Sequence, residues 1–205
     1  MAERKNVHLR QAEVFMIESL TYADENADKY EGEVITQILK LNDKKPIYYY
    51  IRTKKELISV LKTFEKSNYR YLHISCHANN EEMGTTLDSI PFEEFSSIVK
   101  PHLAYKRLFV SACEMVNDKL ARLLLPKSRC YSILGPCKSV SFSSATILWS
   151  SFYHLMFNHD STAMKGDVLR DYATQISGLY EVPLNYFWWS TKSNRLIKRE
   201  IRPNK

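Results

Sequence analysis

The chain has 205 residues, of which 44% are hydrophobic and 25% charged, and its formal net charge is +6 at pH 7. This is the composition of a globular protein with one domain over residues 1–205. The four cysteines form no Cys-x-x-Cys pair, so we expect free thiols in a reducing compartment, and neither a metal site nor a cofactor.

Apolar, strand-like runs alternate with amphipathic stretches along the chain. In chain order, this pattern predicts a strand at residues 14–20, a helix at 29–41, a strand at 47–52, a helix at 54–65, a strand at 69–76, a hairpin at 84–92, a helix at 93–99, a strand at 107–112, a helix at 118–125, a strand at 130–134, helices at 143–157 and 160–178, and one or two terminal strands at 184–190 and 195–201. Gly178 is expected to end the last helix. The fold class is α/β, a three-layer α/β/α sandwich around a mostly parallel sheet of about six strands.

The ends of the chain argue against export and against a nucleic-acid partner. The first eight residues are charged where a signal peptide needs an apolar core. The most apolar stretch, residues 142–157, is too short and too polar for a spanning helix. Lysines and arginines crowd a basic tail at 191–205, but no nucleic-acid-binding motif accompanies them. We therefore expect a cytoplasmic protein without membrane contact.

A histidine and a cysteine follow two of the predicted strands directly. His77 comes after the strand at 69–76, and Cys113 after the strand at 107–112. The carboxyl ends of parallel strands meet at one edge of a sheet, so the two residues should emerge side by side if the strands are neighbours. A thiol and an imidazole within hydrogen-bond reach form a nucleophile and its base. We expect His77 and Cys113 to be joined by a direct or slightly stretched hydrogen bond.

The other cysteines and the nearest histidine have simpler interpretations. Cysteine is among the most buried residue types, and we assign Cys76 and Cys130 to the core. Cys137 follows a proline in a predicted loop and is expected to be a bystander. His73 lies inside its strand and is expected to be packed or hydrogen-bonded.

The segments around His77 and Cys113 resemble those that carry the catalytic pair in CHAT domains, which belong to the caspase-like (clan CD) peptidases. The corresponding segments are Leu72-His73-Ile74-Ser75-Cys76-His77-Ala78 and Leu108-Phe109-Val110-Ser111-Ala112-Cys113-Glu114, followed later by Ile133-Leu134-Gly135, Phe152-Tyr153 and Tyr186-Phe187-Trp188. The resemblance covers roughly residues 12–190, and Ser-Ala-Cys-Glu is its most specific part. One departure is Ala78, where the family usually has glycine.

The resemblance implies a cysteine endopeptidase, a hydrolase that cuts a protein substrate with Cys113 as nucleophile and His77 as general base and acid. The backbone amides of Ala78 and Cys113 would hold the oxyanion. Glu114 and Asp88 are acidic candidates for substrate binding, which would favour a basic residue before the cut. The family's proteins often act as regulated proteases in prokaryotic defence or cell death, which implies an activating protein partner.

Two other functions remain open at this point. The chain could be a catalytically inactive caspase-like module that serves as an adaptor, with the cysteine and histidine intact but the site closed. It could also be a flavodoxin-like ligand-binding domain that shares only the sheet. Neither a Gly-x-Gly-x-x-Gly nor a Walker-type loop occurs, and five glycines in the whole chain are few for such a domain.

Overall fold

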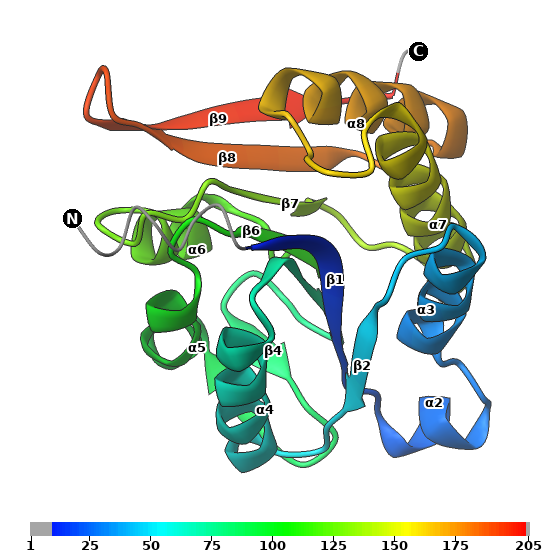
Figure 1. Ribbon diagram of the computed structural model, residues 1–205. Helices are drawn as coiled ribbons and strands as arrows, with labels where there is room; N and C mark the ends of the chain where they lie inside the picture. Colours follow the sequence, from blue (N-terminus) through cyan, green and yellow to red (C-terminus); the bar gives the residue numbers. More distant parts are fainter. Residues whose placement is uncertain (1–9, 204–205) are drawn as a thin grey trace.

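The computed structural model describes residues 10–203, and these form a seven-stranded sheet in the order β2-β1-β3-β6-β7-β8-β9 (Figure 1). The first five strands of this order are parallel, whereas β8 and β9 are antiparallel to their neighbours. The strands are β1 (Gln11–Glu18), β2 (Ile47–Tyr50), β3 (Tyr69–Ser75), β6 (Arg107–Ser111), β7 (Ser132–Pro136), β8 (Leu184–Ser190) and β9 (Arg195–Ile201). A separate hairpin consists of β4 (Glu82–Gly84) and β5 (Ser89–Pro91).

Helices cover both faces of the sheet, and this confirms the three-layer α/β/α architecture (Figure 1). The helices are α2 (Tyr22–Asn26), α3 (Glu31–Leu41), α4 (Lys54–Ser67), α5 (Phe92–Val99), the 3₁₀ turn η2 (Lys100–His102), α6 (Asp118–Leu124), α7 (Phe142–His159) and α8 (Gly166–Tyr180). One face carries α3, α7 and α8, and the other carries α4, α5 and α6. Between residues 10 and 203, no helix combines the length and the apolar character that crossing a membrane requires.

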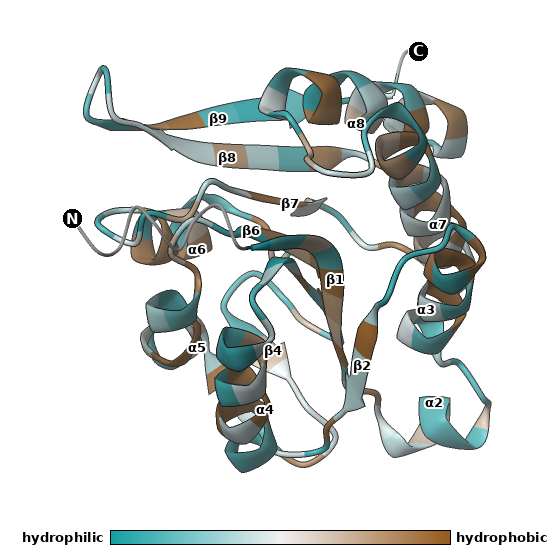
Figure 2. Cartoon of the chain, viewed as in Figure 1, coloured by the Kyte–Doolittle hydropathy of each residue, from teal (hydrophilic) through white to brown (hydrophobic). Residues whose placement is uncertain are grey.

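Each face of the sheet has its own hydrophobic core, because successive residues of a strand point to opposite faces. In β1, Phe15 and Ile17 pack under α4, while Val14 and Met16 pack under α3 and α7. A strand buried on both faces is rich in apolar residues, and Figure 2 shows that β1, hydrophilic at its start, becomes hydrophobic further along. The aromatic centre of the second core is Phe109, whose ring contacts those of Trp149, Phe152 and Tyr153.

Several predicted boundaries are wrong in informative ways. Both terminal segments form strands, so the sheet has seven strands, and residues 195–201 form β9 although they overlap the predicted basic tail at 191–205. The last helix begins at Gly166 instead of residue 160, since the Asp160 carboxylate binds the amides of Thr162 and Ala163 in a loop. Gly178 lies inside α8, which ends before Glu181 in the left-handed conformation (φ 55°). One glycine costs a helix only about 1 kcal/mol, which the packed face of α8 outweighs.

Gly135 in β7 is a position where the fold accepts no side chain. A Cβ built there would lie 2.4 Å from the carbonyl oxygen of Val110 and 2.6 Å from Cγ2 of Val116. These atoms belong to β6 and to the loop that follows Cys113, so the glycine lets β7 approach the segment that carries the cysteine.

Candidate active site

His77 and Cys113 lie at the same edge of the sheet, just beyond two neighbouring strands. Ser75 at the end of β3 is paired with Ser111 at the end of β6, and His77 and Cys113 each follow by two residues. Both line one cavity of about 30 Å³, together with Glu31 from α3 and Phe142 from α7. The adjacency expected from the strand ends is therefore present.

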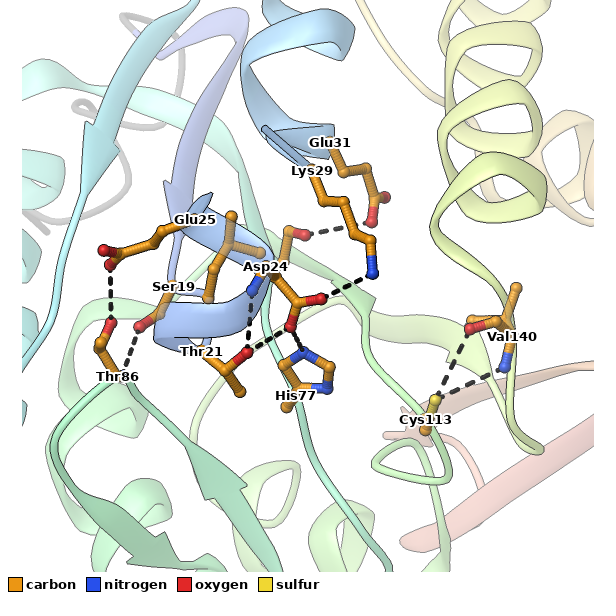
Figure 3. A network of polar contacts seen from close by, with 12 residues as sticks. Ser19, Thr21, Asp24, Glu25, Lys29, Glu31, His77, Thr86, Cys113 and Val140 are labelled. Carbon is orange, nitrogen blue, oxygen red and sulfur yellow. Dashed lines mark hydrogen bonds and ion pairs between the residues drawn. The ribbon is translucent and has the colours of Figure 1, made fainter. Parts of the chain in front are cut away.

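The expected hydrogen bond between His77 and Cys113 is not formed. His77 Nε2 lies 2.7 Å from Oδ2 of Asp24. The amide of Val140 donates to Cys113 Sγ at 3.5 Å, and the thiol is 3.8 Å from the carbonyl oxygen of the same residue. Throughout residues 10–203, no hydrogen bond joins the imidazole to the thiol, and Figure 3 shows them in two separate groups of contacts.

Asp24 is an ionised carboxylate that holds one side of the His77 ring. It is 8% exposed and contacts Thr21, Lys29 and His77 (Figure 3). Burial opposes its ionisation, but these three hydrogen bonds outweigh burial and lower the pKa of Asp24 to about 2. A carboxylate acceptor assigns the neutral imidazole's proton to Nε2, so Nδ1 is left free to act as a base.

The sheet topology explains why Asp24 meets His77. The chain leaves β1, forms β2 on one side of it, and returns to form β3 on the other side. The loops after β1 and β3 therefore flank the point where the strand order reverses, which is where open α/β sheets bind ligands. Asp24 lies in the first loop, on the short helix α2 that Thr21 caps, and the sequence analysis missed it. The signals were the Thr-x-x-Asp cap and the position after β1.

Glu31 places a buried carboxyl group in the wall of the same cavity. It is 4% exposed, and it accepts hydrogen bonds from the hydroxyls of Ser111 at 2.5 Å and Ser75 at 3.2 Å. Burial raises the pKa of Glu31 to about 8, because the serine bonds only partly offset the loss of water and the nearby charge of Glu18 adds to it. No ion pair reaches Glu31 from the part of the chain described. The group is therefore a neutral acid without a counter-ion at pH 7.

The segment from Val140 to Phe142 covers the cavity. Val140 contacts Cys113 as described above, and the Phe142 ring lies edge-on against His77, 5.5 Å between centroids. The ammonium group of Lys29 lies 5.4 Å from the centroid of the Phe142 ring. A cavity of about 30 Å³ holds roughly one water molecule. The cavity is therefore narrow but not sealed, since the His77 side chain is 46% exposed and Cys113 is partly exposed.

The remaining predicted site residues lie around the cavity without lining it. Ala78 pairs with Met83, and its φ is not positive, so alanine is accommodated without strain. Glu114 is exposed, in a left-handed turn (φ 57°) directly after Cys113. The Asp88 carboxylate accepts the amide of Lys54 at 2.7 Å and so supports the start of α4. The substrate-binding roles of Glu114 and Asp88 and the oxyanion role of Ala78 stay predictions.

The simpler interpretations of Cys76, Cys130 and His73 are confirmed, whereas that of Cys137, a partly buried thiol that accepts a hydrogen bond from Arg202, stays a prediction. Cys76 and Cys130 are buried, and burial raises the pKa of both, that of Cys130 to about 12. His73 is fully buried, with Nδ1 2.7 Å from the hydroxyl of Tyr153, and burial lowers its pKa to about 3. Among residues 10–203, no group of three or more His, Cys, Asp or Glu side chains is arranged to hold a metal ion.

Comparison with models of known protein families gives no match, and no curated protein is similar enough in sequence to count as a relative. Among solved structures, the chain is similar to caspase-1 from Spodoptera frugiperda, with a TM-score of 0.49 and 12% sequence identity. The similarity covers 83% of this chain and 79% of that chain. Function therefore has to be inferred from the residues of the site itself.

Proposed function

We propose that the chain is a caspase-like cysteine endopeptidase that cleaves a protein substrate. The observation that supports this function is the shared cavity of His77 and Cys113, with the imidazole held by the ionised Asp24. A histidine used only for packing needs no carboxylate partner and no thiol beside it. Asp24 is a positioning residue in this proposal, and His77 and Cys113 are the catalytic residues.

The chemistry follows from these three groups. Nδ1 of His77 takes the proton of the Cys113 thiol, and the thiolate attacks the carbonyl carbon of the scissile peptide bond. Backbone amides of Ala78 and Cys113 would stabilise the resulting oxyanion. The imidazolium returns its proton to the leaving amine, and a thioester forms. Water, deprotonated by the same imidazole, then hydrolyses the thioester and releases the carboxylic acid and the free thiol.

Glu31 is the residue that we propose to select a basic side chain before the cut. Its carboxyl group lies in the wall of the cavity, fully buried and without a cation. A lysine or arginine side chain entering there would supply the missing positive charge and draw Glu31 into its ionised form. This role suits Glu31 better than Glu114 or Asp88, neither of which lines the cavity.

The narrow cavity supports regulation of the protease. The segment from Val140 to Phe142 leaves little room beside Cys113, and an activating protein partner that moved this segment would widen the site for a peptide. A dedicated role in a prokaryotic defence or cell-death module would fit a peptidase that is inactive until such a signal arrives.

The test is cleavage of a complex peptide mixture, with the new ends identified by mass spectrometry. We expect cuts after lysine and arginine, raised by Phe142→Ala, which removes the ring over His77. Cys113→Ala and His77→Ala should each reduce cleavage by at least about 10³-fold, and the double variant should lose no more than Cys113→Ala alone. Cys137→Ala is the matched control and should cleave normally. Two results would favour the catalytically inactive adaptor instead: cleavage that persists in Cys113→Ala, or no cleavage by Phe142→Ala.

A further inference from the structure

A second cavity lies at the opposite edge of the sheet. Its volume is about 680 Å³, within the range of small-molecule sites. It is formed where β6 and β7 begin, whereas Cys113 follows the end of β6. Tyr105 and Tyr131 precede these two strands, and the turn of the β8–β9 hairpin, in orange at the far left of Figure 1, adds Asn194. Nothing in the proposed peptidase chemistry uses this cavity.

The lining of this cavity is cationic and aromatic. Lys127 and Arg129 supply the charge, and none of the residues that line the cavity is acidic. In the described part of the chain, no ion pair neutralises Lys127. Tyr105, Tyr131 and Trp189 supply aromatic rings. Positive charge beside aromatic faces is the chemistry that binds a phosphate attached to a flat ring.

Four residues in the wall of the cavity have a positive φ, namely Asn194 (48°), a residue type that tolerates it, and three others. Tyr105, Lys127 and Arg129 have φ values of 60°, 62° and 58°, in the left-handed region that non-glycine residues rarely adopt. Their two loops are tied together by backbone bonds, from the Tyr105 amide to the Arg129 carbonyl at 2.8 Å and from the Tyr131 amide to the Lys106 carbonyl at 2.9 Å. Such strain persists where the surroundings enforce it and gathers at ligand sites. The loops are thus fixed in position before any ligand arrives.

We propose that this cavity binds a nucleoside phosphate. Lys127 holds the phosphate, and Arg129, whose Nη1 donates to the Tyr105 hydroxyl at 3.0 Å, adds positive charge beside it. The base stacks on the ring of Trp189 or Tyr131, and Asn194 offers hydrogen bonds to its edge or to the ribose. The volume suits one nucleotide, which favours a mononucleotide over a nucleic-acid strand.

The experiment is calorimetric titration of the full chain with AMP, adenosine and inorganic phosphate. AMP should bind more tightly than either fragment, because only AMP engages both the cations and the rings. Lys127→Gln and Trp189→Leu should each weaken AMP binding by about tenfold or more. Lys62→Gln removes one positive charge from the exposed face of α4 and is the matched control, expected to bind AMP normally. Cys113→Ala should also bind normally, which separates this site from the peptidase proposal.

Three outcomes would overturn the proposal. The first is no heat of binding for AMP up to about 5 mM. The second is AMP affinity that Lys127→Gln and Trp189→Leu leave unchanged while their circular dichroism melting curves match the native chain. The third is binding of a single-stranded RNA octamer without binding of AMP, which would assign the cationic surface to nucleic acid.

Discussion

Replacing Glu31 by glutamine should stabilise the protein at neutral pH. Glutamine has the size of the protonated acid and can keep one bond to each of Ser75 and Ser111, but it does not titrate. Burial raises the pKa of Glu31 from 4.5 to about 8, so at pH 7 the folded chain must keep a proton that the unfolded chain releases. Holding this proton costs the native chain about 1.36 kcal/mol of unfolding free energy for each pH unit above 4.5. At pH 7 the glutamine variant should therefore be more stable by at most about 3 kcal/mol.

The raised pKa of Glu31 determines how the stability difference between the variant and the native chain changes with pH. The stability that the Glu31 proton gives the native chain is fully present below pH 4.5 and is lost as the pH rises through about 8. The variant should therefore equal the native chain near pH 4.5 and exceed it increasingly up to pH 8. Urea unfolding followed by circular dichroism at pH 4.5, 7 and 8 measures the difference. Glu33→Gln, an exposed carboxylate on the same helix, should change little. A pH-independent difference, or a less stable variant at pH 7, would refute a neutral Glu31.

Three further predictions concern the positioning of His77 by Asp24, the shielding of Cys113 by Phe142, and the close packing at Gly135. Asp24→Asn should lower peptide cleavage by about 10²-fold or more. Since its pKa is depressed to about 2, Asp24 stabilises the fold above pH 3.8 and loses this effect as the pH falls toward 2, so the variant should show a flatter acid limb in unfolding titrations. Phe142→Ala should speed iodoacetamide labelling of Cys113 relative to Cys137, measured by peptide mapping, and an unchanged ratio would contradict the cover. Gly135→Ala should lower the free energy of unfolding by about 2 kcal/mol or more in urea, and an unchanged midpoint would contradict the close approach.

The fold could be predicted from the sequence wherever hydrophobic patterning decided it. The central strands are buried on both faces, so they contain short apolar runs, at residues 14–17 in β1 and 108–110 in β6. The antiparallel strand β9 was harder to identify, because its residues are mostly exposed and basic and look like a solvated tail. Helix α8 shows that packing outweighs a single unfavourable residue, since Gly178 does not end it.

The candidate site could be predicted only where it follows strand ends. His77 and Cys113 stand at abrupt boundaries of apolar runs, which a sequence shows directly. Asp24 lies on a five-residue helix without hydrophobic periodicity, and Glu31 looks like an ordinary acidic residue in a first helical turn. Their importance comes from the pairing of β1 with β3 at the point where the strand order reverses, which is a property of the sheet and not of any local segment. The contact between Val140 and Cys113 likewise joins residues that are far apart in the sequence.

The last strand of the sheet, β9, carries charged side chains that oppose self-association. An exposed edge strand offers unpaired backbone groups to the edge of another molecule, and charged side chains there prevent sheets from joining. Strand β9 ends the sheet order and exposes Arg195 and Arg199, whereas Lys198 forms ion pairs with Asp118 and Glu200. Two such edges brought together in antiparallel register would set these positive charges against each other. The charge that looked like a tail in the sequence therefore keeps the open sheet from growing from one copy into the next.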